Sequence, residues 1–101
     1  MVTITVIGEM VADAVLPVDG IIAGNAHMTV HPGGGPANTA VTLARLGTHV
    51  RFAGRISRGP LGALCRTHLE ASAVDLSAAA DVAEPATLAI VQLNASGAAS
   101  Y

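Results

Sequence analysis

Three consecutive glycines between two prolines constrain this chain more than any other stretch of its sequence. The run covers residues 32–38 and reads PGGGPAN. Glycine lacks a Cβ, so its backbone can approach a ligand closely and can adopt positive φ angles. Pro36 suits the first position of a helix, and Asn38 follows within the first turn, where N–H groups are free. The run therefore predicts either a small-ligand site at a helix N-terminus or a plain turn before a helix.

The apolar pattern around this run predicts an α/β fold. Residues 3–8 are β-branched and almost continuously apolar, as expected for a strand that is buried in a parallel sheet. Apolar residues at helical spacing predict a helix over 36–46, with a stop at Gly47. A second strand is expected over 49–54. Strand, helix and strand in this order imply a right-handed parallel crossover.

The rest of the chain is expected to add strands and one helix. No helical pattern lies between Gly8 and Pro32, where a weak alternation over 26–31 predicts an exposed strand. The remaining expected segments are a helix from Pro60, a loop over 72–84 with a short strand near 74–76, and a strand over 86–93 with a returning strand over 98–101.

Composition predicts one small soluble domain with an aliphatic core. The 101 residues are 51% hydrophobic and 12% charged, with a single Phe and a single Tyr. The net charge is −2 and there is no Lys, so no basic surface for nucleic acid is expected. No apolar stretch or basic leader indicates a membrane span or a signal peptide. The single cysteine, Cys65, is expected to be buried and reduced, in a cytoplasmic protein.

The common phosphate and metal motifs are missing. Without Lys there is no P-loop, and the spacing Gly33-x-Gly35 continues to Asn38 where a dinucleotide fingerprint has its third glycine. The four histidines have no metal-ligand spacing, so no metal site is expected. Two acids follow the first strand. Glu9 is interpreted as a solvated loop residue, whereas Asp13 lies where open α/β sheets bind ligands.

In these residues the chain resembles the ribokinase-like (PfkB) carbohydrate kinases. The segment from Gly33 to Ala40, followed by Leu46-Gly47 and Gly54, resembles the first signature of that family. The opening VIGE at 6–9, with Asp13, resembles its first strand and substrate-side acid. Further similar segments are Pro60-Leu61-Gly62 and Ala86-Thr87.

The resemblance implies a partial Rossmann-like, ribokinase-like parallel sheet with helices, plus β-lid strands near 11–32 and 86–101. Residues 1–101 would be the N-terminal, substrate-binding part. Asp13 would then hydrogen-bond sugar hydroxyls, and Asn38 would bind the sugar or brace the loop. Gly33 and Gly34 would present backbone N–H groups to the sugar.

The family also implies ATP and Mg²⁺ as cofactors, and a fructokinase-like or ribokinase-like activity. This chain is about a third as long as family members, and the second family signature and the ATP site are absent. No catalytic residue, bound cofactor or activity is therefore expected of this chain alone. It also has Ser57-Arg58-Gly59 where the family usually carries Gly-x-Asp. Alternatives are a non-catalytic sugar-binding or dimerising module that pairs through its lid strands, and a Rossmann-like nucleotide binder.

Overall fold

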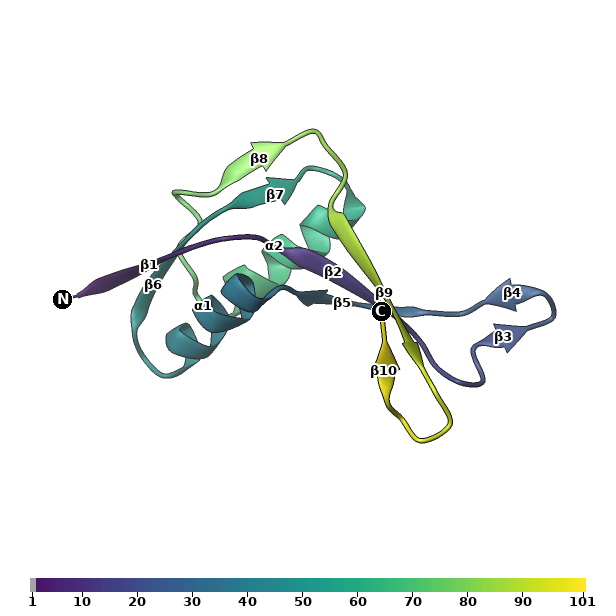
Figure 1. Cartoon of the computed structure of the whole chain (residues 1–101). Coiled ribbons are helices and arrows are strands. Elements are labelled where there is room, and N and C mark those ends of the chain that lie inside the picture. The colour runs from purple at the N-terminus through teal and green to yellow at the C-terminus, as the bar shows by residue number, and fades with distance from the viewer. Residues whose placement is uncertain (1) are drawn as a thin grey trace.

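A parallel pair of strands, β1 (Thr3–Ile7) and β6 (His49–Ala53), runs along one side of the molecule (Figure 1). The computed structural model describes residues 2–101. The register of β1 and β6 pairs Val6 with Phe52. Helix α1 (Gly35–Arg45) packs its apolar face against these two strands. The parallel pairing and the α/β fold class predicted from the sequence are confirmed.

Helix α2 (Pro60–Ala71) packs beside α1 and closes the core. Ahead of it lies the short strand β7 (Arg55–Ser57), which pairs in parallel with β8 (Ala80–Val82). Phe52 is fully buried at the centre of this core. The other buried core residues are Met10, Ala37, Ala40, Val41, Val50, Ile56, Cys65, Leu69 and Val74.

A second, four-stranded sheet carries most of the remaining chain, in the order β10-β9-β2-β5. Strand β2 (Val11–Leu16) is antiparallel to β5 (Thr29–Gly33) and parallel to β9 (Thr87–Leu93). Strand β10 (Ala99–Ser100) folds back on β9. The sequence segments 11–33 and 87–100 therefore lie side by side although they are far apart in the chain.

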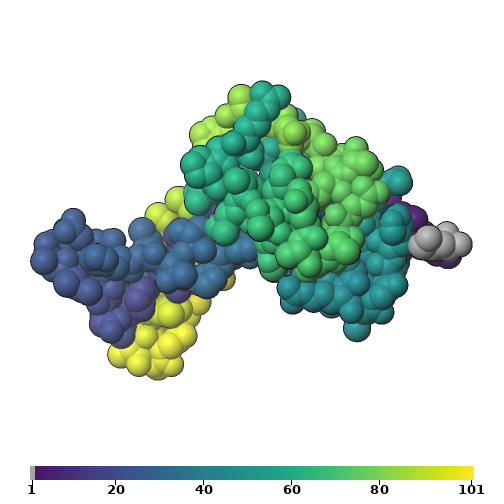
Figure 2. All heavy atoms as spheres, turned by 180° about the vertical axis from the view of Figure 1, so that it is seen from behind, coloured from purple at the N-terminus to yellow at the C-terminus, as the bar shows by residue number. Residues whose placement is uncertain are grey.

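The molecule is elongated because this sheet projects from the helical body. A small hairpin of β3 (Ile21–Ile22) and β4 (Asn25–Ala26) extends it further, as Figure 2 shows in blue. The radius of gyration is 15.2 Å, against about 13 Å for a compact domain of 100 residues.

Some predicted elements have other bounds or surroundings. Strand β1 was expected to be buried but is mostly exposed, with Ile7 80% exposed, because β6 pairs with one edge only and α1 covers one face. The expected strand over 26–31 is split between β4 and β5, and β5 continues to Gly33. Near 74–76 there is a single bridge between Arg51 and Asp75, and β7 and β8 were not predicted.

The predicted helices and the strand over 86–93 are confirmed within a residue or two. Helix α1 begins at Gly35, so Pro36 occupies its second position and the expectation of the first is wrong. The expected burial of Cys65 is confirmed.

Candidate functional site

The glycine loop passes directly against the β1–β2 connection. Gly33 is the last residue of β5, and Gly34 precedes α1 with φ of +98°, a conformation that side-chain-bearing residues rarely adopt. A Cβ on Gly33 would overlap the carboxylate of Asp13. A Cβ on Gly34 would lie 3.0 Å from the carbonyl oxygen of Glu9. Glycine is therefore required at both positions for this close approach.

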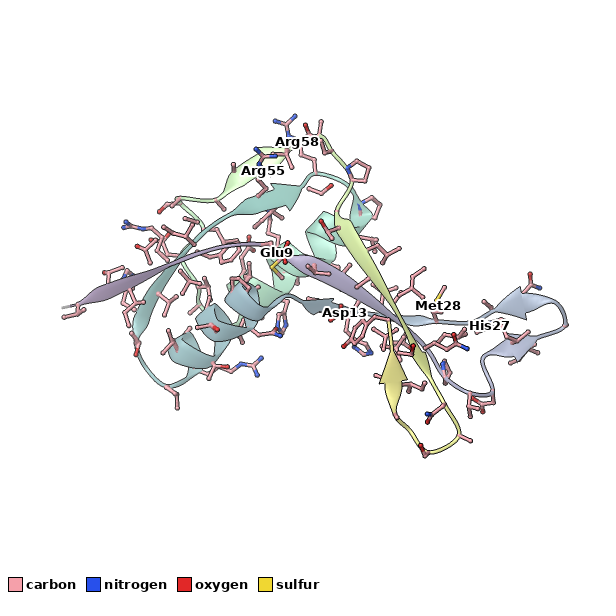
Figure 3. The ribbon with its side chains drawn as sticks, in the orientation of Figure 1. Glu9, Asp13, His27, Met28, Arg55 and Arg58 are labelled. Carbon is pink, nitrogen blue, oxygen red and sulfur yellow. The ribbon has the colours of Figure 1, made fainter. Side chains whose placement is uncertain are left out.

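Asp13 lies in the middle of β2, beside the loop (Figure 3). It is half-buried, and its carboxylate takes part in no hydrogen bond or ion pair within residues 2–101. A carboxylate has acceptor sites on two oxygens. Asp13 can therefore accept several hydrogen bonds from a ligand, whereas Gly33, against which the carboxylate lies, is itself buried.

Asn38 lies in the first turn of α1, immediately after the loop, and is exposed. Its backbone N–H donates to the carbonyl oxygen of Gly34 at 2.9 Å, so the prediction of free N–H groups at this residue is wrong. Its side-chain amide forms no hydrogen bond within the described chain. The structure thus brings Gly33 against Asp13, whereas Asn38 lies nearby without contacting that carboxylate.

A cavity of about 520 Å³ opens next to this loop, beyond the ends of β1 and β6. Its polar lining includes Glu9, Arg55, Glu84 and Thr87, and none of the four predicted site residues lines it. Glu9 is exposed, as expected of a solvated acid. Glu9 and Arg55 come just after the ends of β1 and β6, which is where parallel sheets place ligand sites. That position is the one sequence signal that could have indicated Arg55.

Cys65 of α2 connects the cavity wall to the site, because it lines the cavity and its thiol lies 4.0 Å from the carbonyl oxygen of Val11. Burial, followed by the negative charge of Asp13, raises the pKa of this thiol above its ordinary value. Cys65 therefore stays protonated at neutral pH and packs as an apolar residue.

The charges around the loop favour a neutral ligand over a phosphate. The carboxylate of Asp13 lies against Gly33 and would repel an anion held by the loop backbone. Arg55 and Arg58 lie at the outer edge of β7, away from Asp13 (Figure 3). Residues 2–101 contain no group of three His, Cys, Asp or Glu side chains that could hold a metal ion. The carboxylate at the loop thus does not fit the phosphate groups of ATP.

No helix within residues 2–101 is long and apolar enough to cross a membrane.

Comparison with known proteins identifies the family. A fructokinase from Klebsiella pneumoniae is 34% identical over 99 residues, which are 97% of this chain and 30% of that protein. A Xylella fastidiosa fructokinase solved with bound ATP has a TM-score of 0.84 at 28% identity, over 97% of this chain and 31% of its own. The ribokinase of Thermotoga maritima has the same TM-score of 0.84 at 28% identity, over 99% of this chain and 35% of its own.

The chain therefore has the ribokinase-like fold and spans about 30% of the length of the relatives it matches. The sequence model of the pfkB family carbohydrate kinases matches residues 1–100. This chain belongs to the pfkB family of carbohydrate kinases.

Proposed function

We propose that this chain is the sugar-binding part of an ATP-dependent carbohydrate kinase, and that Asp13, Gly33, Gly34 and Asn38 contact the sugar. The observation that carries the proposal is the juxtaposition of Asp13 and Gly33. A half-buried carboxylate without a hydrogen-bond donor lies against Gly33, whose chain neighbour Gly34 is partly exposed and has no side chain. Sugar hydroxyls would supply the missing donors. The names of several relatives make fructose the first sugar to test.

In our proposal, the residues that bind ATP and activate the sugar hydroxyl lie outside this chain. A related fructokinase was solved with ATP, but the loop here carries a carboxylate where a phosphate would need positive charge. Phosphoryl transfer depends on positioned cations and a base that activates the acceptor hydroxyl. These groups, and the Mg²⁺ ion, would come from further protein, and residues 1–101 alone would not transfer phosphate. A reduced, buried Cys65 is consistent with a cytoplasmic protein.

The test is calorimetric titration of the 101-residue chain with D-fructose. Asp13→Asn should weaken binding by at least about tenfold, because hydrogen bonds to a charged acceptor contribute roughly 1.5–3 kcal/mol. Asp19→Asn is the matched control, since Asp19 is an exposed turn residue outside the site. Equal affinity of wild type and Asp13→Asn would refute the assignment. Phosphorylation of fructose by the isolated chain would refute the proposal that the groups for phosphoryl transfer lie in further protein.

A second proposal is that the chain forms a homodimer through the outer face of the four-stranded sheet. By the register, Leu88 lies opposite Ala12 and Ile90 opposite Ala14. Leu88 is 47% and Ile90 53% exposed, and neither strand places a charge on this face. An uncharged, apolar sheet face of this kind favours association.

A further inference from the structure

We propose that His31 is a second ligand-binding side chain, which together with Asp13 binds neighbouring hydroxyl groups of one polyol. This inference rests on the proposed function, because it adds a contact to the same site. Strands β2 and β5 are antiparallel, and their register places His31 directly opposite Asp13. Side chains that face each other in this way lie on one side of the sheet, with Cβ atoms about 4.5–5.5 Å apart.

The carboxylate of Asp13 and the ring of His31 are both available to a ligand. Asp13 leans along the sheet toward Gly33, since a Cβ there would overlap its Oδ2 atom. Gly33 lies two residues beyond His31 on β5, so it shares the same face. His31 is exposed, and its ring forms no ion pair or hydrogen bond with any described residue.

The chemistry of the two side chains is complementary for a polyol. An ionised carboxylate only accepts hydrogen bonds, whereas a neutral imidazole has one donor and one acceptor nitrogen. A hydroxyl that donates to Asp13 still has lone pairs that need a donor. On the other side of Asp13, β9 contributes Ala89 in register, and its side chain cannot donate. The threonines on this face, Thr87 and Thr29, pair with Val11 and Val15 and so lie diagonal to Asp13. Of the two side chains directly in register with Asp13, His31 is therefore the one that can supply this hydrogen bond.

The experiment is calorimetric titration of D-fructose into the 101-residue wild type and three single variants. His31→Phe keeps an aromatic ring without its hydrogen bonds and should weaken binding by about 3- to 10-fold. His31→Gln keeps an N–H donor and should recover most of that loss. His27→Phe is the matched control, because His27 lies outside β5 and away from Asp13 (Figure 3). It should bind fructose as the wild type does.

Monodeoxy derivatives of fructose sharpen the test. One derivative, which lacks the hydroxyl that His31 contacts, should bind wild type and His31→Phe equally. In the wild-type chain, the ring proton resonances of His31 should also shift on fructose titration, a readout that does not depend on the folding of any variant.

The outcomes separate this inference from the function on which it rests. If Asp13→Asn loses affinity while His31→Phe binds like the wild type and the His31 resonances stay fixed, the inference is wrong and the proposed function stands. If the wild type binds no sugar, both are wrong. If every deoxy derivative shows the full His31→Phe penalty, His31 acts without contacting a hydroxyl, and the inference is again wrong.

Discussion

The pKa of Asp75 depends on hydrogen bonds in the segment that follows α2. Its Oδ1 atom accepts a hydrogen bond from the backbone N–H of Ser77 at 2.8 Å, and the Nε of Arg51 lies 3.5 Å from its Oδ2. The hydrogen bonds from the backbone and then the hydroxyl of Ser77 hold the pKa of Asp75 below its ordinary value, and Arg51 adds to this. The ionised carboxylate is therefore the form that stabilises the fold.

The pH dependence of stability follows from this lowered pKa. A carboxyl whose pKa is lower in the folded state contributes stability above its unfolded pKa of about 3.9 and loses it as the pH falls through the folded value. Asp75→Ala should therefore melt below the wild type at pH 7, and the two melting curves should converge in acid. Thermal melts followed by circular dichroism between pH 2 and 7 measure this. An offset between the two proteins that persists unchanged in acid would contradict it.

At the same scale, the sequence named candidate site residues but did not indicate their neighbours or hydrogen bonds. Asp13 and the glycines were selected through their resemblance to segments of the pfkB family, and their sugar contacts stay a prediction. Cross-strand neighbours such as His31 could not be selected, because the register of β2 and β5 depends on how the two strands pair. Asn38 shows the same limit, since its N–H is bonded only because α1 begins one residue earlier than expected.

At the scale of elements, helix α2 is held against β7 by a glycine. A Cβ on Gly62 would overlap the backbone carbonyl of Ser57, and backbone cannot move aside as a flexible side chain does. Gly35, in the first turn of α1, has no neighbour within 4 Å of the equivalent position. The two helices therefore differ sharply in their tolerance of one methyl group.

Gly62→Ala should destabilise the chain by about 3 kcal/mol, the upper range of overpacking costs. Gly35→Ala should change stability by no more than about 1 kcal/mol. Urea unfolding of the two variants, with circular dichroism as the signal, checks both values. Similar midpoints for Gly62→Ala and the wild type would show that α2 can shift away from β7.

Elements with a strong internal period were the predictable ones. The apolar face of α1 and the β-branched run of β1 are visible in the sequence, and both elements are present. Strands β7 and β8 have three residues each and pair only with each other, so no period within either segment is long enough to indicate them.

At the scale of the whole molecule, the outer face of the four-stranded sheet exposes two large apolar side chains, Leu88 and Ile90, on strand β9. The wild type should sediment as a dimer at micromolar concentration, because Leu88 and Ile90 are the largest exposed apolar side chains on that face. Leu88→Lys/Ile90→Lys should sediment as a monomer, since dimerisation would bury two unpaired charges. Analytical ultracentrifugation distinguishes the two.

Leu46→Lys is the control for this pair, because Leu46 is also apolar and is even more exposed, but lies at the end of α1, away from the sheet. Monomeric wild type, or dissociation by Leu46→Lys as well, would contradict the proposed interface. Fructose binding should survive Leu88→Lys/Ile90→Lys, since Asp13 lies on the opposite face of the sheet.

In the folded chain, the glycine run lies against the carboxylate of Asp13 and the backbone of Glu9. By itself the sequence determined the α/β class and the helix after the glycines, because these depend on local period, whereas the sugar contacts of Asp13 and Asn38 stay a prediction. Only the tertiary structure decided that Gly33 meets the carboxylate of Asp13, that His31 lies opposite it, and that β1 is exposed. Those facts depend on strand register and on which surfaces find a partner, and neither is encoded in a local stretch of residues.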